Sequence, residues 1–324
     1  MLPLRQRTAL LPASLALLLA APACAQNITC TASMSALAFG TVNPLASQTD
    51  ATATLTYSCT NGSNQTRSAR VCFSIGEPGG GATNPRLMSS GANKLQFQMY
   101  QDAARSLVWG SSFFGAFATP FVTTFTLAKN TSTGSQTATL YGRVLANQAT
   151  VVPGAYTNPY LNADTAITIN EANGTTPPSA CSMTQTGQYF PFTVSATVDK
   201  RCNVSASALD FGTTGLLTAA TPGTSTIGVQ CSAGAAYTVG LDAGLNGGGN
   251  INARRMVLGA GAVGYQLYSN ATRTTVWGNT TGSNTVAGSG TGATQNYTVY
   301  GLVPAQTTPA AGTYQDTITV TVTY

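Results

Sequence analysis

The chain has 324 residues, of which 43% are hydrophobic, enough for one large or two ordinary globular domains. Only 7% of the residues are charged, against about 25% in an average soluble domain. The 14 Lys and Arg and the 9 Asp and Glu give a net charge of +5, and the basic residues form no run. This pattern excludes an electrostatic footprint for nucleic acid or an anionic membrane. Because the chain contains no histidine, His-based triads and His zinc sites are excluded as well.

The N-terminal stretch predicts a secretory signal peptide over residues 1–25. Two arginines precede an apolar run over residues 9–21, and Ala23-Cys24-Ala25 forms an A-x-A cleavage site. The rival interpretation is a lipoprotein acylated at Cys24, but no leucine stands three positions before that cysteine. Cleavage after Ala25 lowers the net charge to +3 and leaves six cysteines, an even number that fits disulfide pairing outside the cytoplasm.

The remaining chain contains an internal duplication. Cys30, Phe39-Gly40 and Cys59 recur 172 residues later as Cys202, Phe211-Gly212 and Cys231. Further matches follow at smaller offsets: QMYQD with QLYSN at 168, LYGRV with VYGLV at 159, GAY with GTY at 158, and DTAITI with DTITVT at 152. The falling offset places extra residues in the first copy near GEPGGGATNP, within SSFFGAFATPF and at TNPYLNA. We therefore expect two related domains, over residues 26–185 and 186–324.

The segments between these matches have the pattern of β-strands. TATLTYSC, LQFQMYQD, TATLYGRV and DTITVTVTY alternate apolar and polar residues, are rich in Thr, Val and Tyr, and are separated by Gly, Asn and Pro. Strand number and turn spacing predict an all-β fold of two tandem immunoglobulin-like β-sandwiches.

The cysteine spacing predicts three disulfides. Equal spacing in the two copies indicates that Cys30 pairs with Cys59, and that Cys202 pairs with Cys231. The two cysteines that lack a counterpart in the second copy, Cys72 and Cys181, would then pair with each other. The alternative is that Cys181 is free or forms an intermolecular bond.

Several motifs together resemble a known family. The CxxSxSALxFG opening, the Arg-Met-x-x stretch before YQLYSN, the Trp-Gly pair and the terminal GTYQDTITVTVTY resemble the spore coat protein U domain, the module of Csu-type archaic chaperone–usher pilins. The resemblance covers nearly the whole chain after residue 25 and is most specific in the second copy. It implies an incomplete immunoglobulin-like sandwich that lacks its last strand. It also implies a periplasmic chaperone, an outer-membrane usher and an adjacent pilin subunit that donates its N-terminal strand as partners, and the cell surface as the destination.

The two ends of the chain fit an acceptor that does not donate. The sequence ends at Tyr324 within an alternating strand, so we expect the second sandwich to lack its last strand and to accept one. Only four residues separate the expected cleavage site from Cys30, and they span at most roughly 14 Å. A donor-like segment, YFPFTVSATV at residues 189–198, instead lies between the copies. It either completes the first domain in cis or forms the first strand of the second.

The surface of the first domain is the candidate binding region. Phe113, Phe114 and Phe117 lie in a stretch punctuated by Gly and Pro, which predicts a loop with exposed apolar side chains. The alternative is that these rings enlarge the core, and for Phe121 and Phe125 we expect the core. The insertion carrying Tyr156, Tyr160 and Leu161 is a second candidate tip, and Leu87-Met88 is a weaker third.

These features predict the tip adhesin of a chaperone–usher pilus, attached to an abiotic or host surface through hydrophobic loops. A lectin-like glycan-binding tip module and a structural spore-coat or minor pilin subunit are the alternatives. The carboxylates are dispersed and the glycine-rich loop lacks a P-loop pattern, so we expect no enzyme, no catalytic residues, no cofactor and no metal.

Overall fold

The computed structural model describes residues 27–113 and 115–324. The predicted signal peptide, with its cleavage site and Cys24, lies outside the described residues. Within the described ranges, strands dominate and helix is limited to two 3-10 turns, η1 (Pro78–Gly80) and η2 (Asn162–Asp164). The predicted all-β class is confirmed. No helix in these ranges is long and apolar enough to cross a membrane.

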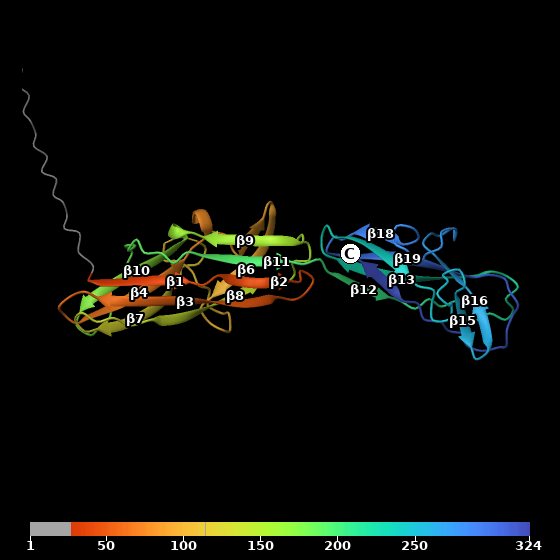
Figure 1. Ribbon diagram of the computed structural model, residues 1–324, viewed down its shortest axis with the longest axis horizontal. Coiled ribbons are helices and arrows are strands. Elements are labelled where there is room, and N and C mark those ends of the chain that lie inside the picture. Colours follow the sequence, from red (N-terminus) through yellow and green to blue (C-terminus); the bar gives the residue numbers. More distant parts are fainter. Residues whose placement is uncertain (1–26, 114) are drawn as a thin grey trace, which may run out of the picture.

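The first sandwich, called domain one, spans residues 27–198 (Figure 1). A large sheet has the strand order β1-β3-β8-β6-β5-β9-β11-β2, and a smaller one has the order β10-β4-β7. The strands are β1 (Ile28–Met34), β2 (Leu37–Val42), β3 (Thr49–Asn61), β4 (Arg67–Ile75), β5 (Arg86–Ser90), β6 (Asn93–Tyr100), β7 (Phe121–Leu127), β8 (Gln136–Val144), β9 (Gly154–Tyr160), β10 (Thr165–Asn173) and β11 (Phe192–Val198).

The second sandwich, called domain two, spans residues 202–324 and has its own hydrophobic core. Its two sheets have the orders β12-β13-β19-β17 and β18-β14-β20, and β15 and β16 form a hairpin. The strands are β12 (Cys202–Ala206), β13 (Thr221–Cys231), β14 (Ala236–Leu241), β15 (Arg255–Leu258), β16 (Gly261–Gly264), β17 (Gln266–Tyr268), β18 (Val286–Ser289), β19 (Thr294–Val303) and β20 (Val320–Thr323).

Alternating side chains determine which face of each strand enters the core. In β3, Leu55 and Cys59 are fully buried while Thr54, just before Leu55, and Thr60, just after Cys59, are exposed. This register places Cys59 directly opposite Cys30 of β1. The two expected intra-copy disulfides, Cys30–Cys59 and Cys202–Cys231, are both present, each between directly paired strands.

Strand β11 belongs to the sheet of domain one. It pairs antiparallel with β9, where Phe192 lies opposite Tyr160, and parallel with β2, where Val194 lies opposite Leu37. Five alternating side chains of the segment enter the core of domain one: Phe190, Phe192, Val194, Ala196 and Val198. Of the two interpretations of residues 189–198, the structure has the first, completion of domain one in cis. The two cores therefore divide between Val198 and Cys202, later than the expected boundary at residue 185.

The third disulfide holds the approach to β11. Cys72 of β4 bonds to Cys181, which lies in the segment between β10 and β11. The segment then runs beside β10, where the Ile167 N–H donates to the Gln188 carbonyl and the Phe190 N–H donates to Thr165 Oγ1. The predicted Cys72–Cys181 pairing thus fixes where β11 enters its sheet.

The two sandwiches follow each other end to end along the long axis of the molecule (Figure 1). The connection is short, since the Asp199 N–H donates to the Val42 carbonyl in domain one and the Ser232 N–H donates to the Arg201 carbonyl in domain two. Gly292 of domain two packs directly against the main chain of Ala149, and a Cβ at that glycine would overlap the Ala149 oxygen. The sandwiches therefore contact each other beside the connection as well as through it.

Equivalent hydrogen bonds define which residues of the two copies correspond more firmly than the sequence matches do. The indole Nε1 of Trp109 donates to the Phe73 carbonyl, and that of Trp277 donates to the Val239 carbonyl. Ile167 lies opposite Phe73, and Val322 lies opposite Val239. Ile167 therefore corresponds to Val322, and the offset of 152 expected from DTAITI and DTITVT is wrong at this strand. The η2 turn, between β9 and β10, is an insertion in domain one.

Candidate functional sites, an open groove and an inserted-loop surface

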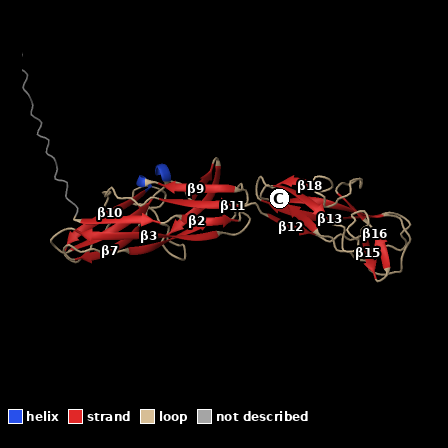
Figure 2. Cartoon of the chain, viewed as in Figure 1, coloured by secondary structure: helices blue, strands red, loops and turns tan. Residues whose placement is uncertain are grey.

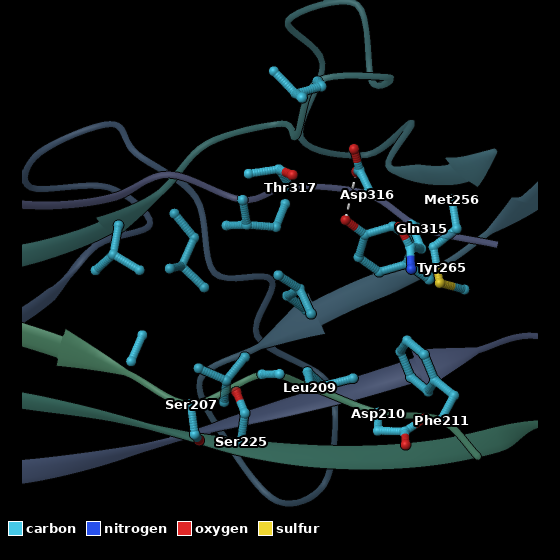
Figure 3. A pocket seen from close by; sticks show the side chains of 18 of the residues that line it. Ser207, Leu209, Asp210, Phe211, Ser225, Met256, Tyr265, Gln315, Asp316 and Thr317 are labelled. Carbon is cyan, nitrogen blue, oxygen red and sulfur yellow. Dashed lines mark hydrogen bonds between the residues drawn. The ribbon is translucent and has the colours of Figure 1, made fainter. Parts of the chain in front are cut away.

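Domain two contains an open groove of about 740 Å³ between its two sheets. Leu209 and Phe211 lie on one side, while Tyr265 and Asp316 lie on the other (Figure 3). Further apolar residues line it, among them Ile227, Leu241, Leu267, Val299, Ile318 and Val320. The groove thus exposes the interior of a sandwich.

Domain one has the same groove, and β11 fills it. The offset of 172 makes Leu37 and Phe39 the counterparts of Leu209 and Phe211. Leu37 and Phe39 have exposed fractions of 0% and 6% beneath β11, whereas both counterparts are half-buried. On the opposite side, β9 residues pair with β11 and are buried, while their domain-two counterparts are half-buried: Tyr156, Asn158 and Tyr160 correspond to Tyr314, Asp316 and Ile318. The difference between the two grooves is the presence of one strand.

The backbone at the edge of the open groove already has the conformation seen at the edge of the filled groove. The parallel pairing of β11 with β2 contains an irregularity beside Gly40, whose φ is +65°. Its counterpart Gly212 has a φ of +75°, a left-handed conformation that glycine adopts at little cost. Residues 207–214 belong to no strand, whereas the equivalent β2 is a strand because β11 pairs with it. The missing element is therefore the pairing partner, and the local backbone geometry is present without it.

The groove contains one polar cluster. The Tyr265 hydroxyl donates to Asp316 Oδ2 at 2.6 Å, and Asn246 Nδ2 donates to Asp316 Oδ1 at 2.9 Å (Figure 3). Burial, followed by the hydrogen bond to Asp316, raises the pKa of Tyr265 well above its ordinary value. The hydroxyl therefore stays protonated and remains a donor to the carboxylate.

Each sandwich is also built around one buried arginine that the sequence did not single out as a site. Arg86 and Arg254 are each 1% exposed and hydrogen-bond a glutamine, Gln98 and Gln266, together with the carbonyls of two neighbouring segments. Burial lowers the pKa of Arg254. Both pairs recur at the offset of 168, so the repeat itself was the signal. Because the guanidinium groups of these arginines donate hydrogen bonds to main-chain oxygens, the arginines have a structural role.

The three inserted segments of domain one meet at one place. The Gly76 N–H donates to the Asp164 carbonyl at 2.9 Å, and the Gly79 N–H donates to Asp164 Oδ1 at 3.1 Å. Gly115 lies against Gly76 and Glu77, with its Cβ position 3.6 Å from the Gly76 Cα. Figure 2 shows the two 3-10 turns side by side on the flank of domain one, midway along its length. We call this region, residues 76–81, 111–113, 115–118 and 161–164, the inserted-loop surface.

A buried ion pair lies beneath the inserted-loop surface. Glu77 Oε1 lies 3.3 Å from Arg86 Nε, and the side chains are 4% and 1% exposed. Burial raises the pKa of Glu77, and the Arg86 charge opposes that shift. The Phe117 ring covers the same guanidinium, with 5.4 Å between the Arg86 Cζ and the ring centroid. Phe117 therefore has a packing role as well as a partly exposed face.

The predicted contact residues divide among several environments. Phe113 and Phe117 are half-buried, and Leu161 is 63% exposed, so these three reach the inserted-loop surface. Phe114 lies outside the described residues. Phe121 and Phe125 pack against the core of domain one, as predicted.

The expectation that Tyr156 and Tyr160 form an exposed tip is wrong. Both are fully buried in β9, where the alternation of GAYTNPY turns Tyr156, Asn158 and Tyr160 inward. The Tyr156 hydroxyl donates to the Val152 carbonyl, and the Tyr160 ring stacks on Phe192 at 4.8 Å between centroids. The weaker candidate Leu87-Met88 is corrected as well, because Met88 is fully buried in β5.

No cluster of three or more potential metal ligands occurs within residues 27–113 and 115–324.

The repeat, the two sandwiches and the groove point to one family, and a family model confirms it. The Spore Coat Protein U domain model matches residues 15–159 and 188–321. The chain belongs to the Spore Coat Protein U domain family. The second match begins at residue 188, so it includes β11, which packs in the first sandwich.

Solved structures match this spore coat U family member at low sequence identity, and the first of those described next shares its fold. A chaperone–tip adhesion subunit pre-assembly complex from archaic chaperone-usher Csu pili of Acinetobacter baumannii contains a chain that is 18% identical, with a TM-score of 0.52. The match covers 91% of this chain and 100% of that chain. The CupB6 tip adhesin from Pseudomonas aeruginosa is 13% identical over 90% of this chain and 93% of that chain, with a TM-score of 0.33. A search of curated proteins found no match.

Proposed function

We propose that this protein is the tip subunit of a chaperone–usher pilus, joined to the fibre by a strand that inserts into the groove of domain two. The observation that carries the proposal is β11. It occupies in domain one the position that is open in domain two, and it runs parallel to β2 and antiparallel to β9. A strand from another subunit would bury the half-exposed Leu209, Phe211 and Ile318 in the same way.

The position at the tip follows from how the donor-like segment is used. Residues 189–198 have the alternating pattern of a donor strand, but they are paired on both edges within domain one. Domain one is therefore complete without another subunit, while domain two needs one. Such a chain ends a fibre, and this agrees with the family and with the fold shared with a complex of a tip adhesion subunit. Transit through the periplasm with a chaperone and assembly at an outer-membrane usher complete the proposal.

The acceptor role is tested by supplying a strand in cis. The full chain is extended after Tyr324 by a flexible linker as long as residues 174–188 and then by the sequence YFPFTVSATV. Burial of the alternating side chains, less the cost of ordering the linker, should stabilise domain two by on the order of 5 kcal/mol. Calorimetry with two resolved transitions measures it. The control extension carries Ser at the five inward positions, and an equal effect of both extensions would contradict the acceptor role.

The inserted-loop surface is the proposed adhesion site. Phe113 and Leu161 expose apolar area on segments that domain two lacks. Hydrogen bonds of Gly76 and Gly79 to Asp164 hold the segment of Leu161, and the packing of Gly115 against Gly76 places the segment of Phe113 beside it. Two such side chains supply on the order of 3 kcal/mol on burial, which is weak for one molecule. Many fibres on one cell would make the attachment strong.

Adhesion is tested with Phe113→Ser combined with Leu161→Ser in piliated cells. Phe117 is left in place because its ring covers Arg86, and its loss would disturb the buried ion pair. Attachment to hydrophobic surfaces should fall at least tenfold while fibre number is unchanged. Leu216→Ser is the matched control, since Leu216 is 69% exposed in domain two and does not line the groove. Unchanged attachment of the double variant would remove the site, and glycan binding that survives it would favour a lectin-like tip.

A further inference from the structure

Domain one shows which donor residue faces the polar position of the groove. Val194 of β11 lies directly opposite Asn158 of β9. Both side chains are buried, with exposed fractions of 0% and 8%, so both point into the sandwich. Asn158 is neutral and is hydrogen-bonded without β11, because its Nδ2 donates to the Leu87 carbonyl at 3.0 Å. An apolar donor residue therefore suits domain one.

Domain two places a carboxylate at the same position. Asp316 is the counterpart of Asn158, and Tyr265 is the counterpart of Phe97, so at two neighbouring positions a carboxylate stands in place of a neutral amide and a phenol in place of an apolar ring. The Asp316 carboxylate accepts one hydrogen bond on each oxygen, from Tyr265 and from Asn246. A carboxylate can accept about four hydrogen bonds, so acceptor capacity remains on the side that faces the groove. The backbone of Gly244 packs so closely on Asp316 that any Cβ there would overlap Oδ2, which holds the carboxylate in place.

The competing role for Asp316 is to compensate the positive charge of the buried Arg254. Arg254 directs its hydrogen bonds to Gln266 and to the carbonyls of Leu241, Asp242 and Trp277. In domain one, the equivalent arginine has Glu77 as its ion partner, on a different segment from β9. Asp316 is thus placed toward the groove, with Tyr265 between it and the core. This position suits contact with a donor strand better than compensation of the Arg254 charge.

We propose that Asp316 selects the donor strand, by favouring a hydrogen-bond-donating side chain of about valine size, Thr or Ser, at the position that Val194 occupies in β11. This inference rests on the proposed acceptor role of domain two. Inserting a strand removes water from the carboxylate, and an apolar residue at that position would leave its remaining acceptor capacity unmet. The β11 segment of a second copy carries Val there and would be the poorer donor, so the groove discriminates against the chain's own strand.

The experiment compares two strands that differ by one near-isosteric residue. The full chain carries the C-terminal extension YFPFTVSATV or YFPFTTSATV, in which the sixth residue corresponds to Val194. Hydrogen bonds to charged groups are among the stronger ones, so the Thr strand should shift the unfolding equilibrium of domain two by about tenfold more than the Val strand. The same two strands are then tested with Asp316→Asn, which restores the residue of domain one.

The outcomes separate the two proposals. In Asp316→Asn, the advantage of Thr should fall to less than about threefold, because a neutral amide accepts a weaker hydrogen bond than a carboxylate. Equal stabilisation by the Val and Thr strands, or an advantage of Thr that Asp316→Asn leaves unchanged, would overturn the selection by Asp316 while the acceptor role stands. If neither strand stabilises domain two more than the extension with Ser at its inward positions, the acceptor role itself fails. Asp242→Asn is the matched control, since Asp242 is also close to Arg254 but does not line the groove, and it should leave the advantage of Thr intact.

Discussion

In domain one, Leu37 and Phe39 are buried beneath β11, whereas in domain two their counterparts Leu209 and Phe211 are half-buried at the edge of an open groove. The two copies otherwise share the disulfide at the first strand, the buried arginine with its glutamine, and the tryptophan whose indole donates to a main-chain carbonyl of the smaller sheet. One strand therefore separates the filled groove of domain one from the open groove of domain two, and that strand is encoded between the two copies.

The largest effect is expected from removing that strand. Replacing residues 189–198 by a Gly and Ser segment of equal length deletes five buried side chains, worth on the order of 10 kcal/mol. Domain one should lose its cooperative unfolding transition, and domain two should keep its own. Calorimetry and the protection of domain-one amides from hydrogen exchange measure the result. An unchanged domain-one transition would show that β11 is dispensable.

A matched pair of truncations measures how much the equivalent groove residue, Phe39 or Phe211, stabilises its domain. Phe39→Ala removes a ring that is 6% exposed and should destabilise domain one by about 3–5 kcal/mol. Phe211→Ala should cost domain two clearly less in the free chain, because Phe211 is half-exposed there. In the chain extended by YFPFTVSATV, the two costs should converge, as followed by chemical denaturation. Equal costs before the strand is added would mean that the groove of domain two is already closed.

The smallest expected effect concerns two equivalent tyrosines. The Tyr156 hydroxyl donates to the Val152 carbonyl, and the Tyr314 hydroxyl donates to the Ala310 carbonyl, in each case four residues earlier. Tyr156 is fully buried, so Tyr156→Phe should cost domain one about 1 kcal/mol. Tyr314→Phe should cost domain two no more than a few tenths of that, since water can replace the bond at an exposed site. A larger effect at Tyr314 would reverse the assignment of the open domain.

The sequence predicted the features that repeat and the features that alternate. The duplication at 172 residues located both first-strand disulfides, and the alternation of YFPFTVSATV identified β11, because strand geometry has a period of two. The same alternation in GAYTNPY places Tyr156 and Tyr160 on one inward face, whereas the fall in offset nearby predicts an inserted tip at these residues. The extra residues in fact form η2, one turn later. A change of offset indicates that a region contains inserted residues, but it does not indicate which of its residues are inserted.

Other features required the three-dimensional arrangement. The convergence of the three insertions depends on contacts between segments far apart in the chain, namely hydrogen bonds from Gly76 and Gly79 to Asp164 and the packing of Gly115 against Gly76. The role of Phe117 depends on Arg86, a residue buried despite its charge, which composition alone would place at the surface. The replacement of Asn158 by Asp316 is visible in the sequence, but its place in a groove is not.

The way β11 leaves domain one has a mechanical consequence. The strand passes directly into domain two through residues 199–201, and it is hydrogen-bonded along both edges, to β9 and to β2. Tension between a fibre held at domain two and a surface held at domain one would act along β11, so the hydrogen bonds on both edges would be sheared together rather than opened one at a time. If the strand did slip, Cys181 would stop it, because its covalent bond to Cys72 ties the chain to the opposite sheet. In the proposed fibre, the same segment that completes the first sandwich would thus be the tether through which the molecule bears a pull.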